Sequence, residues 1–140
     1  MKVMIDSNII IDVLASHKRF FESSSALIKL CGIDVSGFII STQLSKIYGV
    51  LRRGGIDDKS ARKVLKIITE NLLIVDVTAN DATSALETNA SDYDYSVLAV
   101  CAKRVKADFI VTRNAAGFLG TPVPVISPEE YIAKFNAHDA

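Results

Sequence analysis

Residues 3–8 read VMIDSN, a short apolar run that ends in three polar residues. Such a run is typical of a strand buried in a parallel sheet, because helices cover both faces of that sheet and both faces carry apolar side chains. The polar residues then stand at the carboxyl end of the strand, where we expect a helix to begin. This stretch therefore predicts the first strand and turn of an α/β fold.

Short apolar runs and helical periodicity alternate from this stretch to the end of the chain. Further strands are predicted at 38–40, 73–77, 109–111 and 123–126. Apolar residues at three- and four-residue steps predict helices over 23–31, 42–53, 56–68, 81–88 and 94–104, with Gly32 at the C-cap of the first. Ser127, Pro128 and Glu130 form a capping box for one more helix. This order predicts right-handed βαβ units, a mostly parallel central sheet and helices on both of its faces.

Polar residues follow several of the predicted strands. In open α/β sheets the functional residues gather at the carboxyl ends of the strands. Here those ends carry Asp6-Ser7-Asn8, Ser41-Thr42, Asp76 and Thr112-Arg113-Asn114. We therefore expect a site that is built from residues far apart in the sequence.

Composition limits the possible functions. The length of 140 residues suits one domain with one core, and the 49% apolar content excludes a disordered chain. The 16 basic and 16 acidic residues cancel, so contact with a polyanion must rest on a local patch. Only Cys31 and Cys101 occur, both in apolar runs, which predicts buried reduced thiols and a cytoplasmic location. No apolar stretch suits a signal peptide or a membrane span.

The acidic residues at the predicted site each have two interpretations. Asp6 could cap the helix that follows it, or it could act as a hard oxygen ligand for Mg²⁺ or Mn²⁺. Asp92 and Asp94 open another predicted helix, where acidic residues are stabilised by the helix dipole without any further role. A nuclease metal site needs several converging carboxylates, and Asp6 with Asp92 or Asp94 could begin one. His17 and His138 lack a pairing typical of metal ligands, and we discount both.

The densest basic region lies between Arg52 and Lys66. Part of it falls on one face of a predicted helix, which is the usual pattern of a solvated surface. It could also contact phosphates, but no aromatic residues are interleaved with it to stack on bases. RNA binding is therefore an open alternative here.

Four stretches occur in an order specific enough to indicate a family. They are 4–14, 40–51, 92–99 and 107–114. Together they resemble the PIN-domain family, which includes the VapC toxins of bacterial and archaeal toxin–antitoxin pairs. The resemblance spans nearly the whole chain and implies a single PIN-like domain over residues 1–140, with three α/β/α layers around a mostly parallel central sheet.

The resemblance implies a metal-dependent endoribonuclease, in which carboxylates hold Mg²⁺ or Mn²⁺ and activate a water for attack on RNA. It implies Asp6 and Asp94 as metal ligands, with Asn114 as a further catalytic residue. The residues expected to bind substrate or shape the site are Ser7, Asn8, Lys46, Asp92, Tyr95, Thr112 and Arg113. The partners it suggests are RNA, an antitoxin-like protein and further copies of the same chain.

The sequence departs from the family pattern at three positions. The second acid of the family corresponds to Lys46 here, and the third corresponds to Tyr95, although a one-residue shift would restore Asp94. The last acid lies at the position of Asn114 or in a dipeptide that reads Gly117-Phe118. A lysine in an acidic centre could pair with Asp6 and take the place of a metal ion.

Two functional hypotheses follow from these departures. The first is a PIN-like domain with weakened or lost catalysis, and weak or absent metal, that acts by binding RNA or a protein partner. The second is an active Mg²⁺- or Mn²⁺-dependent endoribonuclease that uses Asp6 and Asp94. We favour the first, because three losses at one site are hard to reconcile with a working hydrolase. A phosphoacceptor receiver domain is disfavoured, since Asp6 lacks the second acid expected beside it.

Overall fold

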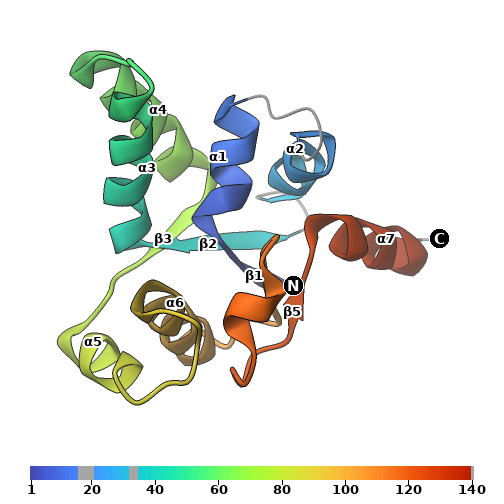
Figure 1. Cartoon of the computed structure of the whole chain (residues 1–140). Helices are drawn as coiled ribbons and strands as arrows, with labels where there is room; N and C mark the ends of the chain where they lie inside the picture. The colour runs from blue at the N-terminus through green and yellow to red at the C-terminus, as the bar shows by residue number, and fades with distance from the viewer. Residues whose placement is uncertain (16–20, 32–34, 140) are drawn as a thin grey trace.

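The computed structural model of the chain describes residues 1–15, 21–31 and 35–139, and Figure 1 shows its arrangement. The strands are β1 (Lys2–Ile5), β2 (Ser36–Ile40), β3 (Leu73–Val75), β4 (Phe109–Val111) and β5 (Val125–Ile126). The helices are α1 (Ser7–Ala15), α2 (Phe21–Leu30), α3 (Ser41–Arg53), α4 (Asp58–Asn71), α5 (Ala79–Ala85), α6 (Tyr93–Arg104) and α7 (Pro128–Asp139), with a 3-10 helix η1 (Ala115–Phe118). The predicted α/β class is confirmed.

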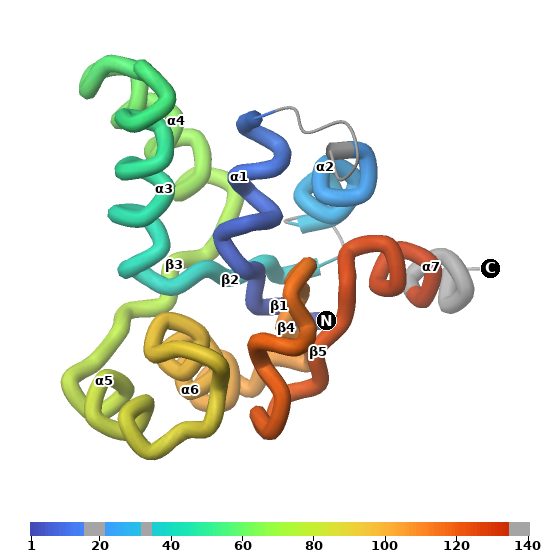
Figure 2. Tube along the Cα trace, viewed as in Figure 1, coloured from blue at the N-terminus to red at the C-terminus, as the bar shows by residue number. Residues whose placement is uncertain are grey.

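One five-stranded sheet forms the centre of the described structure, in the order β3-β2-β1-β4-β5. Figure 2 shows β4 beside β1, at the point where the chain returns to the middle of the sheet. All four strand pairs are parallel, whereas the sequence predicted a mostly parallel sheet. The β3 strand is shorter than predicted, because the chain leaves the sheet after Val75.

Helices cover both faces of the sheet and give three layers. In β1, Val3 and Ile5 point into a core shared with α1, α2, α3, α4 and α7. Met4 points to the opposite face, into a core shared with α5, α6 and η1. This alternation is the two-residue period of a strand that is buried on both sides. The predicted three-layer architecture is confirmed.

Local sequence signals explain several helix ends. The Asp92 side chain accepts a hydrogen bond from the Tyr95 amide at 3.0 Å and caps α6, and Ser127 Oγ accepts one from the Glu130 amide at 3.1 Å at the start of α7. Within the described residues, no helix is long and apolar enough to cross a membrane. The predicted cap at Gly32 and the side chain of His17 lie outside the described residues.

Both cysteines are free and buried. Burial raises the pKa of the Cys31 thiol to about 11. Burial, followed by the neighbouring Asp81 carboxylate, raises the pKa of Cys101 to about 12. Both thiols are therefore protonated near neutral pH, as expected of buried structural cysteines.

Candidate active site

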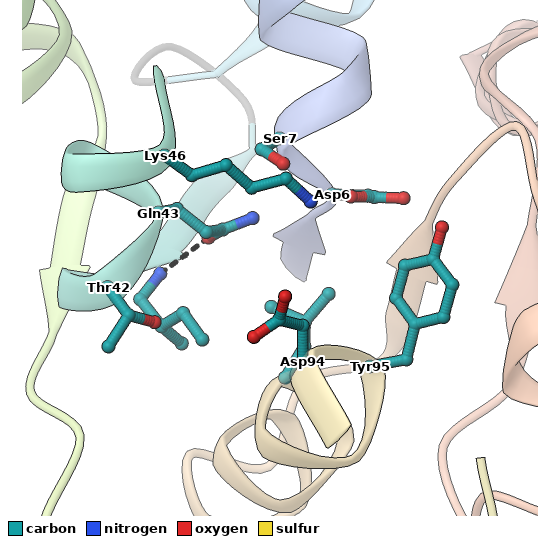
Figure 3. A pocket seen from close by; sticks show the side chains of 9 residues that line it. Asp6, Ser7, Thr42, Gln43, Lys46, Asp94 and Tyr95 are labelled. Atoms are coloured by element: carbon teal, nitrogen blue, oxygen red, sulfur yellow. Dashed lines mark hydrogen bonds between the residues drawn. The ribbon is translucent and has the colours of Figure 1, made fainter. Parts of the chain in front are cut away.

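A cleft of about 190 Å³ opens at the carboxyl ends of β1 and β2, between α3 and α6 (Figure 3). Its lining residues come from both sides of this gap: Asp6, Ser7, Ile40, Thr42, Gln43, Lys46, Asp94, Tyr95 and Leu98. The carboxyl ends of parallel strands are the usual place for a functional site in such a sheet. The cleft therefore lies where the sequence predicted it.

Asp6 forms the buried end of the cleft and is only 2% exposed. Thr112 Oγ1 donates a hydrogen bond to Asp6 Oδ2 at 2.7 Å, and the Asn114 amide donates to Thr112 Oγ1 at 3.0 Å. The Asn8 amide approaches Asp6 Oδ1 at 3.5 Å. These contacts fix the Asp6 carboxylate from the ends of β1 and β4.

Gln43 ties the two strand ends beneath the cleft together. Its Nε2 donates to the Ile5 carbonyl at 2.9 Å, and its Oε1 accepts from the Ile40 amide at 2.7 Å. The side chain is buried, so both bonds form in a low-dielectric setting where unpaired backbone groups would be costly. The floor of the cleft is thereby held by β1, β2 and α3 at once.

Lys46 and Asp94 enter the cleft from opposite walls. The Lys46 side chain extends from α3 toward Asp6 and Ser7, while Asp94 points in from α6 (Figure 3). Both side chains are exposed at the mouth. Among the ion pairs of the described residues, none joins Lys46 to Asp6. Lys46 and Asp6 thus share the cleft without forming the ion pair that we expected.

Tyr95 stands beside Asp94 and connects the cleft to η1. Its hydroxyl accepts a hydrogen bond from Asn114 Nδ2 at 3.1 Å. Its ring lies against Phe118, with the ring centroids 4.5 Å apart. Gly117 is buried next to this ring. Two of the three departures from the family pattern therefore meet at one place.

Two predicted site residues are used elsewhere in the structure. Asp92 caps α6, which matches its alternative interpretation. Arg113 pairs with Asp12 of α1, and its terminal nitrogen lies 2.6 Å from Asp12 Oδ1. Neither residue lines the cleft. Arg113 instead anchors the chain just after Thr112, the residue that contacts Asp6.

Comparisons with known proteins agree with the fold described above. The sequence matches the PIN domain family over residues 2–116. The chain belongs to the PIN domain family. Among curated proteins, none matches it significantly.

Solved structures resemble this PIN domain over almost its whole length. A chain of the VapBC2 structure from Rickettsia felis, bound to a promoter DNA fragment, has 19% identity and a TM-score of 0.66, with 91% of this chain and 98% of that chain covered. A chain of the VapBC-1 structure from nontypeable Haemophilus influenzae has 13% identity and a TM-score of 0.69, with 92% of this chain and 99% of that chain covered. VapC20 of Mycobacterium tuberculosis, a toxin that cleaves the sarcin–ricin loop, has 12% identity and a TM-score of 0.66, with 84% of this chain and 96% of that chain covered. At these identities the likeness shows the fold alone.

Members of the PIN domain family typically depend on a divalent metal ion. Mg²⁺ and Mn²⁺ prefer several converging anionic oxygens. Among the described residues, the cleft offers the Asp6 and Asp94 carboxylates. Thr112 already binds one Asp6 oxygen, and the ammonium of Lys46 enters the same space. Among the described residues, no group of three or more His, Cys, Asp or Glu side chains could hold a metal ion.

Sequence reasoning missed two residues of this PIN domain that matter for the site. Gln43 occupies the third position of α3, and its bond to the Ile5 carbonyl spans 38 positions of sequence. Asp12 is buried on α1 and receives Arg113 across 101 positions. The only sequence signal for either was a polar residue within an otherwise apolar helical pattern.

Proposed function

We propose that this chain is a PIN-domain protein in which metal-dependent RNA cleavage is weakened or lost, and which acts by binding a protein partner. The observation that carries the proposal is Lys46, which enters the cleft from α3 toward Asp6. The resemblance puts a carboxylate at this position. An ammonium there repels a divalent cation and removes one of its ligands, so both effects reduce metal affinity.

Two apolar grooves along α1 support a protein partner. The first lies between α1 and α3, encloses about 240 Å³ and is lined mainly by aliphatic side chains, including Ile11, Leu14 and Leu51. The second lies between α1, α2 and α4, and Leu14 lines it as well. Paired grooves that flank one exposed leucine suit the apolar face of an amphipathic helix. Structural neighbours of the chain come from VapBC toxin–antitoxin complexes, which favours an antitoxin-like partner.

RNA binding finds less support in the charged surface. In the basic region of α3 and α4, Arg62 Nε bonds to Asp58 Oδ2 at 2.9 Å, and Arg52 bonds to the Tyr48 hydroxyl at 2.9 Å. These two guanidinium groups are partly neutralised by their neighbours. Because the chain has no net charge, attraction to RNA would have to come from a local patch such as this one.

The partner is tested by isolating the chain with its bound protein from the source cells and rebuilding the complex from purified components. We expect Leu14→Asp to abolish the rebuilt complex, and Leu86→Asp, on an exposed leucine beyond α5, to leave it intact. A complex that survives Leu14→Asp would exclude these grooves as the docking site. Light scattering on the same samples tests the predicted homo-oligomer.

Loss of catalysis is tested with a fluorescent single-stranded RNA in the presence of Mn²⁺ or a chelator. We expect little cleavage by the wild type, and more by the combined variant Lys46→Glu, Tyr95→Asp, Gly117→Asp, because that variant restores three carboxylates. Adding Asp6→Ala to the combined variant should remove the gain. Robust wild-type cleavage that is sensitive to chelator and depends on Asp6 would overturn the proposal.

Metal binding provides an independent measurement of the same proposal. We expect calorimetry with Mn²⁺ to show weak binding by the wild type. A tight, stoichiometric site that Asp6→Ala abolishes would favour the alternative function.

That alternative is an active endoribonuclease that uses Asp6 and Asp94. One observation favours it: the two carboxylates line the same cleft, Asp6 at its buried end and Asp94 on the α6 wall. Asp94→Asn separates the two functions. It should abolish cleavage in an active nuclease and leave partner binding unchanged in either case.

A further inference from the structure

Gly117 and Tyr95 are in unusually close contact. A Cβ atom placed on Gly117 would lie 2.6 Å from Cε2 and 2.8 Å from Cδ2 of the Tyr95 ring, and 3.0 Å from Nδ2 of Asn114. Separations below 3.0 Å are not tolerated between such atoms, so one of the groups would have to move. The Tyr95 ring therefore fills the space that any side chain at position 117 would need.

The Tyr95 ring is not free to swing aside. Phe118 lies against it, with ring centroids 4.5 Å apart, and Asn114 donates to its hydroxyl. The backbone of η1 is held as well, since the Gly117 carbonyl accepts from the Ser91 amide at 2.9 Å just before α6. A side chain at position 117 thus meets an aromatic ring that is fixed on several sides.

The same ring is connected to the buried carboxylate of the cleft. Asn114 donates from its side chain to the Tyr95 hydroxyl and from its backbone to Thr112 Oγ1. Thr112 in turn donates to Asp6 Oδ2. Three consecutive hydrogen bonds therefore run from α6 through the loop after β4 to the end of β1.

We infer that Tyr95 and Gly117 form one interlocked unit, in which the absence of a side chain at position 117 admits the Tyr95 ring, and Tyr95 positions Asp6 through Asn114 and Thr112. Two of the three departures from the family pattern are then a single change. Tyr95 is a positioning residue in this arrangement. The inference does not depend on whether the cleft cleaves RNA or on what docks along α1.

One consequence concerns the order in which acidic residues can be restored. Gly117→Asp alone places a side chain into the Tyr95 ring, whereas Tyr95→Asp first removes the ring and opens the space. Gly117→Asp is therefore compatible with the fold only when Tyr95 is replaced as well. A screen that tests each substitution alone would therefore not detect that Gly117→Asp depends on Tyr95→Asp.

A double-mutant cycle tests the interlock. The variants are Gly117→Ala, Tyr95→Ala and their combination, each followed by thermal unfolding. We expect Gly117→Ala to lower the melting temperature in the wild type and to have a much smaller effect when Tyr95 is already alanine, because only the contact with Asn114 then remains. Equal losses in both backgrounds would overturn the inference.

The positioning role is tested by Tyr95→Phe, which keeps the ring and removes only the hydroxyl that accepts from Asn114. Tyr93→Phe is the matched control, because the Tyr93 hydroxyl donates to the Ala82 carbonyl and Tyr93 does not line the cleft. In nitrogen–proton NMR spectra we expect Tyr95→Phe to shift the Asn114 side-chain amide and the Thr112 and Asn114 backbone amides, while Tyr93→Phe leaves them in place. Unchanged Thr112 and Asn114 signals in folded Tyr95→Phe would overturn the positioning role.

Discussion

Two buried aspartates, Asp81 and Asp6, are stabilised in different ways. Asp81, on α5, is 1% exposed and bonds to Arg104 of α6, with Nε at 3.0 Å from Oδ1 and Nη2 at 2.9 Å from Oδ2. Asp6 is 2% exposed, but the hydrogen bonds described for its carboxylate come from one hydroxyl and one backbone amide. Burial alone thus does not distinguish them.

The difference lies in the cation. The Arg104 guanidinium holds the pKa of Asp81 down to about 2, and it also bonds to the Asp76 carbonyl, so this ion pair joins β3, α5 and α6. Among the described residues, Asp6 has no ion-pair partner, and it lines the cleft. A buried carboxylate with its own arginine stabilises the fold, whereas the Asp6 carboxylate faces the cleft.

The largest expected effect is on the Asp81 side of the comparison. Asp81→Ala removes the ion pair and the bond from the Thr78 amide, and should lower the free energy of unfolding by about 2–3 kcal/mol. Urea unfolding measures it. A loss below about 0.5 kcal/mol would mean that the Arg104 pair contributes nothing to stability.

Acid should weaken the same pair. The pKa of Asp81 lies near 2 in the folded state, below its ordinary value of 3.8, so the carboxylate stabilises the fold fully above pH 3.8 and loses this contribution as the pH falls toward 2. Urea midpoints of the wild type and Asp81→Asn, measured across this window, should converge at low pH. A constant difference between them would contradict the assignment.

Substitution of Asp6 should affect the free energy of unfolding much less than substitution of Asp81. Asp6→Asn keeps the size of the side chain and breaks no ion pair of the described residues, so the free energy of unfolding should change by less than about 1 kcal/mol. The measurement is urea unfolding beside the Asp81→Asn protein. If Asp6→Asn costs as much as Asp81→Asn, the two aspartates do not differ as described.

The smallest effect on stability is expected at Lys46. Its side chain is exposed, so Lys46→Met should change the free energy of unfolding by no more than about 0.5 kcal/mol. Removing its charge from the cleft should nevertheless raise the affinity for Mn²⁺ severalfold. Lys66→Met, on an exposed lysine of α4 outside the cleft, is the control, and equal gains in both variants would indicate a non-specific charge effect.

Much of this architecture could be predicted from the sequence, because local patterns of apolar and capping residues determine where the strands and helices begin and end. The apolar run before Asp6 and the Ile-Val-Thr-Arg-Asn segment place two strand ends, and parallel pairing brings them together. The capping signals of Asp92 and Ser127 are equally local. Arg113 was predicted beside the cleft, but the buried Asp12 attracts its guanidinium to α1.

The coupling of Tyr95 with Gly117 could not be predicted from the sequence. It depends on where a ring from α6 meets the backbone of η1, and that geometry follows from the packing of both elements against Phe118. The same holds for Gln43, since its two bonds require the ends of β1 and β2 to be in register. Side chains whose role depends on tertiary distances leave no pattern along the chain.

The bond between Thr112 and Asp6 spans 106 positions of sequence. Because synthesis proceeds from the N-terminus, the ribosome must release the chain as far as Thr112 before Asp6 meets the hydroxyl that orients it. Until then the Asp6 carboxylate lacks its hydrogen bond from Thr112, although α1, β2 and α3 have already emerged. The cleft is consequently completed only after β4 has emerged, and a chain truncated before β4 would carry Asp6 but no organised site.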